Sequence, residues 1–129
     1  MERFSSKHES RVLAQASTAP AMARRFVSST LDAWGLGDVC ADMPLVTSEL
    51  VTNAVRHAGS DVDVSLDLTK DRLRLEVSDC SAQPPVMRDA GHAPDGGWGM
   101  QIVSLLASQW GLESRANGKT VWCEVDLPA

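Results

Sequence analysis

Three polar residues in the stretch SELVTNAVRHAGS are spaced four apart: Glu49, Asn53 and His57. On a helix, this spacing places side chains one above another on a single face. A carboxylate can act as a general base or orient a water, and an amide oxygen is a hard ligand suited to Mg²⁺. Asn is also a poor helix former, because its side chain competes for backbone hydrogen bonds. Taken alone, however, an ordinary polar boundary face with Asn53 bonded to a neighbouring backbone is the commoner arrangement.

A second candidate element is the glycine-rich segment DGGWGMQIV. Gly96, Gly97 and Gly99 precede or open an apolar segment with helical periodicity. Glycines let the backbone approach a ligand closely, and the free N–H groups of a helix N-terminus attract anions such as phosphate. A flexible loop with a helix cap would need one glycine but hardly three. The segment therefore favours a site for a pyrophosphate or triphosphate.

A third candidate is Asp79 in the segment EVSDCSAQPP, where a strand pattern ends and a long loop begins. A carboxylate there can accept a hydrogen bond from an exocyclic amine, although an Asp that starts an Asx-turn is common at such positions. The segment Gly118-Lys119-Thr120 looks like the end of a phosphate-binding P-loop. That motif requires a glycine where this chain has Glu113, and it requires a helix where this chain has the strand-like VWCEV.

Composition limits the classes of protein that need to be considered. The chain has 129 residues and a net charge of −5, which predicts one domain and argues against binding through nucleic-acid phosphates. No run is apolar and long enough to span a bilayer, and no signal-peptide pattern is seen, so a cytoplasmic location is the expectation. Cysteines and histidines are scattered, which disfavours disulfides and Cys/His metal sites.

Hydrophobic periodicity in the N-terminal half predicts a strand, two helices and a hairpin, in that order. A first strand is expected near 9–16. A helix follows from a cap at Ser17 or Thr18 to the glycines at 35–37, and a second helix begins between 38 and 44 and ends at Gly59. Strict alternation predicts a hairpin of residues 62–68 and 73–77.

The C-terminal half is expected to add one more helix and a second hairpin. Residues 80–97 read as a long loop, which favours a functional lid, and a helix is predicted from about 98 to 109. Asn117-Gly118 is a strong signal for a type I′ hairpin turn. The expected fold is α+β, a two-layer sandwich with helices on one face of a mostly antiparallel sheet. Residues 1–17 would form a tail with the first strand, and 18–129 a single domain.

Together, these elements resemble the GHKL ATPase superfamily (gyrase, heat-shock chaperone, histidine kinase, MutL). Glu49-x-x-x-Asn53 matches its N box, Asp79 its first glycine-box aspartate, Gly97-x-Gly99 its second glycine box, and Gly118-Lys-Thr120-Val its G-T-x-V segment. Each motif is weak alone, but four in register are specific. The resemblance covers about 18–127 and is greatest to the bacterial anti-sigma-factor serine/threonine kinase branch, through SELVTNAVRHA and LDAWGL.

This resemblance implies ATP and Mg²⁺ as cofactors. Asn53 would coordinate the Mg²⁺ that bridges the phosphates, and Glu49 would be the catalytic base for the attacking hydroxyl. His57, one turn beyond Asn53, would reach a phosphate.

The remaining implied roles concern the adenine base and the phosphates of ATP. Asp79 would accept from the adenine amino group, helped by Thr120 through a water. The backbone amides of Gly97 and Gly99 would cradle the phosphates. The chain departs from the usual D-x-G-x-G pattern, because Asp79 is followed by Cys-Ser-Ala-Gln-Pro-Pro, and its lid, about 86–95, is short.

Two functions follow from the resemblance. The first is a serine/threonine protein kinase that phosphorylates a small anti-sigma-factor antagonist and holds a sigma factor inactive. The second is a nucleotide-gated module that sequesters its partner without transferring phosphate. Glu49 favours the first, and the altered first glycine box and short lid favour the second. A remoter alternative is a non-nucleotide α+β protein, and a sensor histidine kinase is disfavoured. A homodimer through the helix with Phe26 and Trp34 also fits the branch.

Overall fold

The computed structural model describes residues 6–80 and 107–128 of the chain. The elements in chain order are β1 (Lys7–Leu13), α1 (Ala19–Ala33), α2 (Met43–Ala58), β2 (Val62–Leu68), β3 (Arg72–Asp79), β4 (Gln109–Arg115) and β5 (Gly118–Asp126). The loop expected at 80–97 and the helix expected at 98–109 lie almost entirely outside the described residues. At the end of that expected helix, Ala107 and Ser108 are not helical and Gln109 already begins a strand.

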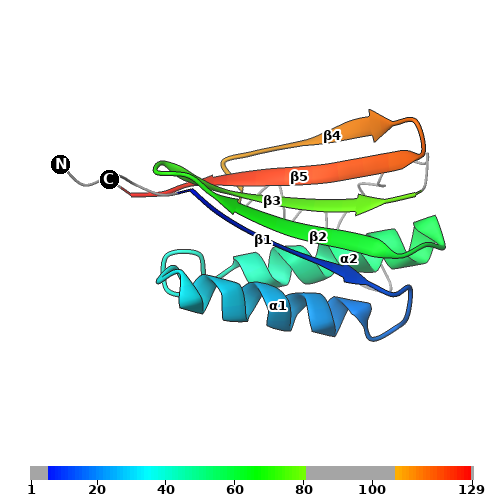
Figure 1. The fold of residues 1–129 in the computed structure, drawn as a ribbon, viewed down its shortest axis with the longest axis horizontal. Helices are drawn as coiled ribbons and strands as arrows, with labels where there is room; N and C mark the ends of the chain where they lie inside the picture. Colours follow the sequence, from blue (N-terminus) through cyan, green and yellow to red (C-terminus); the bar gives the residue numbers. More distant parts are fainter. Residues whose placement is uncertain (1–5, 81–106, 129) are drawn as a thin grey trace, which may run out of the picture.

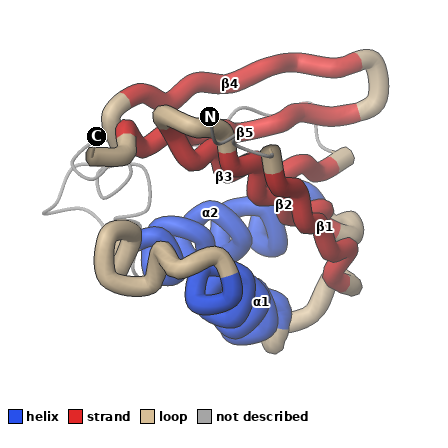
Figure 2. The backbone as a smooth tube through the Cα atoms, turned by 60° about the vertical axis from the view of Figure 1, so that its left-hand side comes forward, coloured by secondary structure: helices blue, strands red, loops and turns tan. Residues whose placement is uncertain are grey.

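The strands form one antiparallel sheet with the order β1-β2-β3-β5-β4. Both helices cover the same face of this sheet and run in opposite directions (Figure 1). The helical layer and the sheet layer are also separate in a second view (Figure 2). The predicted α+β fold, with helices on one face of a mostly antiparallel sheet, is confirmed. β1 is hydrogen-bonded to β2 along its whole length and forms one edge of this sheet.

The two predicted helices form where their end signals indicated. α1 begins after Thr18 with Pro20 in its first turn, where a missing N–H costs nothing. α2 ends at Gly59, whose φ of 62° is left-handed, a backbone conformation that glycine adopts without a steric penalty. These ends fix the position of α2 relative to the start of β2, three residues further on.

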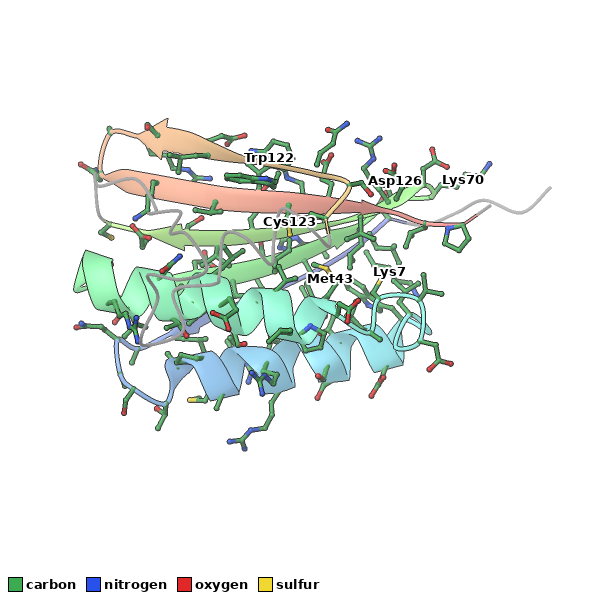
Figure 3. The ribbon with its side chains drawn as sticks, turned by 180° about the vertical axis from the view of Figure 1, so that it is seen from behind. Lys7, Met43, Lys70, Trp122, Cys123 and Asp126 are labelled. Carbon is green, nitrogen blue, oxygen red and sulfur yellow. The ribbon has the colours of Figure 1, made fainter. Side chains whose placement is uncertain are left out.

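The core lies between the helices and the inner face of the sheet. Alternate residues of β2 and β3 are buried there, and the stripe of α2 that includes Val46, Leu50 and Ala54 packs against them. The side chains of β5 also alternate between the two faces, and Figure 3 shows Trp122 and Cys123 on opposite sides of the sheet, although burial in β5 does not alternate. Cys123 points toward the helices and is fully buried. The side on which a β5 residue lies can therefore be decided from its spacing to Cys123.

The hairpin of β4 and β5 is confirmed, but its predicted type I′ turn is wrong. Arg115 pairs with Gly118, so the two turn residues are Ala116 and Asn117. A type I′ turn needs a positive φ at both, and no non-glycine residue in the described ranges has one. Gly118 is required for a different reason. A Cβ at this position would collide with the backbone oxygen of Asp79 and lie 2.8 Å from Cα of Cys80.

Candidate nucleotide site

Asn53 projects from α2 at the edge of the core and is half-buried. Three neighbouring hydroxyls of the same helix bond to backbone carbonyls: Thr47 to Met43, Ser48 to Leu45 and Thr52 to Ser48. Within the part of the chain that the structure describes, the Asn53 amide makes no such bond. The alternative in which Asn53 only satisfies a neighbouring backbone group is therefore not what the structure shows. Its amide oxygen is available to a ligand.

Glu49 lies one turn before Asn53 and lines a groove of about 440 Å³ between α1 and α2. Partial burial raises the pKa of the Glu49 carboxyl, while the charges of Arg24 and Arg56 act in the opposite direction. The Arg24 guanidinium is held in this groove by a hydrogen bond of 3.0 Å from its Nη2 to the Ser48 hydroxyl. A carboxylate with a raised pKa beside a cation is suited to general-base work.

Asp79 is the last residue of β3 and lies on the inner face of the sheet, the face that the helices cover. The turn after α2 is joined to the same end of β3, because the backbone N–H of Cys80 donates to the Ser60 hydroxyl at 3.1 Å. The fold therefore brings Asp79 to the end of the sheet at which α2 finishes. This relation joins two sequence motifs that are 26 residues apart, Asn53 and Asp79.

The carboxylate of Asp79 forms a buried ion pair that the sequence reading did not predict. Nζ of Lys119 lies 3.0 Å and 2.9 Å from its two oxygens, and the two side chains are only 2% and 5% exposed. The pair follows from the register, since Asp79 is directly opposite Lys119 on β5. A buried charge is costly unless it is paired, and Lys119 supplies the opposite charge.

Thr120 lies on the other face of the sheet from Asp79. It is opposite Ser78, and the two hydroxyl oxygens are 2.8 Å apart. Thr120 is two residues from Trp122 on the outer face, whereas Lys119 is four residues from the inward-pointing Cys123. The structure therefore brings Lys119, not Thr120, to Asp79. The expectation that Thr120 assists Asp79 through a water is corrected, because the two side chains lie on opposite faces of the sheet. The alternation of Val121, Cys123 and Val125 was the sequence signal that could have shown this.

The other residues of the expected site are only partly described. His57 is in the last turn of α2 by its backbone, and Gly97 and Gly99, which were expected to bind phosphates, lie outside the described residues. Over 6–80 and 107–128, no group of three Asp, Glu, His or Cys side chains is arranged to hold a metal. A Mg²⁺ held by one protein oxygen and by ligand phosphates needs no such group.

Neither described helix is long and apolar enough to cross a membrane.

Residues 12–124 match the model of the histidine kinase-like ATPase domain family. This match spans nearly all of the sheet and both helices, and the chain belongs to that family. The resemblance to the GHKL ATPase superfamily is therefore confirmed. A search of curated proteins found no match.

Among solved structures, the fold is similar to a crystal structure of the RsbU and RsbW domains of Rv1364c from Mycobacterium tuberculosis. The TM-score is 0.69 at 21% identity, over 95% of this chain and 34% of that chain. This chain thus spans about a third of that protein. The histidine kinase domain of a blue-light activated histidine kinase from Erythrobacter litoralis EL346 matches over 66% of this chain and 43% of that chain, with a TM-score of 0.49 and 26% identity.

Proposed function

We propose that this protein is an ATP-binding regulator that acts on a protein partner, and that ATP lies between α2 and the inner end of β3. The observation that carries the proposal is the unused amide of Asn53, one turn from Glu49, on a helix whose end is tied to the strand of Asp79 through Ser60. Membership of an ATPase domain family supports the choice of nucleotide.

In this proposal the residues have separate tasks. Asn53 would hold the Mg²⁺ that accompanies ATP, and that ion would neutralise phosphate charge during transfer. Glu49 would accept the proton of the attacking hydroxyl, and its raised pKa supports that role. Asp79 would accept from the purine amino group, with Lys119 beside it. His57 would reach a phosphate, and the amides of Gly97 and Gly99 would cradle the phosphates.

The finer proposal is a serine/threonine kinase of the anti-sigma-factor type. Its substrate would be a small anti-sigma-factor antagonist, and its binding partner a sigma factor. The groove between α1 and α2 supports transfer to a protein hydroxyl, because Glu49 lines a groove that also contains Arg24 and Ser48. The branch that the chain resembles is often dimeric, and α1 would supply the surface for a homodimer of this chain.

The alternative is a nucleotide-gated module that holds its partner without phosphotransfer. Its support is the departure from the D-x-G-x-G pattern, because Asp79 is followed by Cys-Ser-Ala-Gln-Pro-Pro. The two functions share the nucleotide site and differ only in whether Glu49 is used.

Calorimetric titration of ATP with Mg²⁺ tests nucleotide binding. The unmodified chain should bind in the micromolar range, which corresponds to about −8 kcal/mol, and Asn53→Ala should lose the Mg²⁺-dependent part of the affinity. Thr52→Ala is the matched control, because Thr52 is its neighbour on α2 and its hydroxyl donates to the backbone carbonyl of Ser48. Unchanged Mg²⁺-dependent affinity in folded Asn53→Ala would exclude Asn53 as the metal ligand.

Transfer of labelled γ-phosphate to purified small acceptor proteins separates the kinase from the gated module. Glu49→Gln should retain ATP affinity and lose transfer. If the unmodified chain binds ATP and an acceptor but transfers nothing, the gated module is the better description.

A further inference from the structure

We infer that two copies of this chain pair through the free edge of β1, so that their two sheets join into one continuous antiparallel sheet. Among the described strands β1 pairs only with β2, and its other edge borders the sheet on the side of α1 (Figure 2). This inference rests on the proposed homodimer and names β1, rather than α1, as its main contact. Nucleotide binding does not depend on it.

The backbone of β1 is suited to accept another strand. Its seven residues pair with β2 without a gap, so no bulge interrupts the strand, and it contains no proline. Six of the seven residues are exposed, including the apolar Val12. Natural sheets commonly protect an exposed edge by a bulge, a proline or a very short strand. β1 has none of these three, and its outer row of backbone N–H and C=O groups has no strand partner in the described ranges.

The charges of β1 select a second copy of the chain as the partner. When two identical strands pair in antiparallel fashion about a two-fold axis through Ser10, Glu9 of each copy lies opposite Arg11 of the other. Opposite charges across a strand pair are stabilising, and like charges are destabilising. Moving the axis to Glu9 or to Arg11 would place two like charges opposite each other. The charge pattern therefore favours the axis at Ser10.

The length of β1 favours the same axis. Ser10 is the midpoint of the strand, so all seven residues of one copy are paired with residues of the other. β4, at the other edge of the sheet, offers no equivalent pairing. Its opposite charges meet only about an axis at Ser114, which pairs just 113–115, and its Glu113 is already 3.4 Å from Arg74. Complementary charge and full overlap occur together only at β1 among these two edge strands.

The paired charges lie on the face of the sheet that the helices cover. The Arg11 guanidinium is 5.3 Å from the centre of the Phe26 ring on α1. Glu9 and Arg11 also line a groove of about 320 Å³ with residues of α1 that include Trp34. An axis perpendicular to the sheet keeps both helical layers on one face, so α1 of each copy flanks the joined strands. The helix thus contributes to the dimer beside β1.

Sedimentation equilibrium of the full chain and of charge-reversal variants tests the pairing. Glu9→Arg and Arg11→Glu each create two like-charge pairs, so each variant should dimerise about tenfold or more weakly than the unmodified chain. An equimolar mixture of the two variants should restore the dimer, because every Arg then faces a Glu. Lys70→Glu is the matched control. It reverses an exposed charge in the turn between β2 and β3 and should leave the dimer unchanged.

The outcomes separate this inference from the proposed function. A dimer that neither reversal weakens would overturn the inference and leave a homodimer through α1 standing. A dimer that both reversals weaken but the mixture does not restore would overturn the pairing of Glu9 with Arg11. A monomeric unmodified chain would overturn both forms of homodimer, while ATP titration decides nucleotide binding separately.

A further variant keeps the test decisive if one of the single variants does not fold. The chain that carries both Glu9→Arg and Arg11→Glu exchanges the two charges and keeps each pair opposite in sign. It should dimerise as strongly as the unmodified chain, and a monomer would overturn the inference.

Discussion

The Lys119 ammonium lies within 3.0 Å of both carboxylate oxygens of Asp79, at the point where β3 ends and β5 begins. Two strands that are distant in the sequence are thus joined by a buried ion pair inside the proposed base site. Burial makes each charge dependent on the other, because removing one side chain removes an ion pair that offsets the desolvation of the second.

Lys119→Met should therefore lower the free energy of unfolding by about 3–5 kcal/mol. The double variant Asp79→Asn with Lys119→Met should be more stable than Lys119→Met alone, since no charge is then left buried. Urea denaturation of Lys119→Met, Asp79→Asn, the double variant and the unmodified chain measures this coupling. Additive losses in the double variant would show that the two side chains do not depend on each other.

Gly118→Ala should be destabilised by about 1–3 kcal/mol, because its Cβ would meet the backbone of Asp79 and Cys80, which cannot move independently of β3. Gly111 is a useful comparison. A Cβ there would lie 2.8 Å from the Trp122 ring, and a half-buried side chain on the outer face can shift. Gly111→Ala should thus lose less stability in the same denaturation experiment, and a reversed order would contradict the close approach at Gly118.

Arg24→Gln should move the acid limb of phosphotransfer to higher pH. Burial raises the Glu49 pKa above its ordinary value near 4.5, and Arg24 opposes this rise, so its removal raises the pKa further. The base must be ionised, which then happens only at higher pH. Carboxyl ¹³C NMR titration of Glu49 provides a direct measurement. Arg25→Gln is the control, because Arg25 lines the same groove but does not contribute to the Glu49 shift; equal shifts in both variants would contradict the assignment.

The same raised pKa affects stability in a defined direction. The folded state holds the Glu49 proton more tightly than the unfolded chain does, so its stabilising contribution is present at low pH and is lost as pH rises above about 4.5. Glu49→Gln removes this dependence. The free energy of unfolding of Glu49→Gln, relative to that of the unmodified chain, should therefore be higher at pH 7 than at pH 4. Urea denaturation of both proteins at the two pH values measures this difference.

Cys80 should be the fast-reacting thiol among the three cysteines. Cys80 is exposed, whereas Cys40 and Cys123 are buried. Burial raises the pKa of both buried thiols, in Cys123 to about 12, and only the thiolate is nucleophilic. Iodoacetamide at pH 8 should thus modify one site per folded chain, identified by mass spectrometry. Fast modification of Cys123 in the folded chain would contradict its place in the core.

Much of the fold could be predicted from local patterns. α2 was predicted to end at Gly59, and strict alternation predicted β2 and β3, because burial of one face has a period that the sequence shows directly. The turn of the second hairpin could not be predicted this way. Asn117-Gly118 is a local turn signal, but Gly118 is required by its contact with Asp79, which is 39 residues earlier in the chain.

The site shows the same division. The sequence by itself determined the column of Glu49 and Asn53, since helical spacing is a local property, and it identified Asp79 as a strand-ending carboxylate. Only the tertiary structure decided that Lys119, and not Thr120, faces Asp79. The reason is strand register: a shift of one residue moves a side chain to the opposite face of the sheet, and register is set by pairing between strands rather than by the residues of one strand.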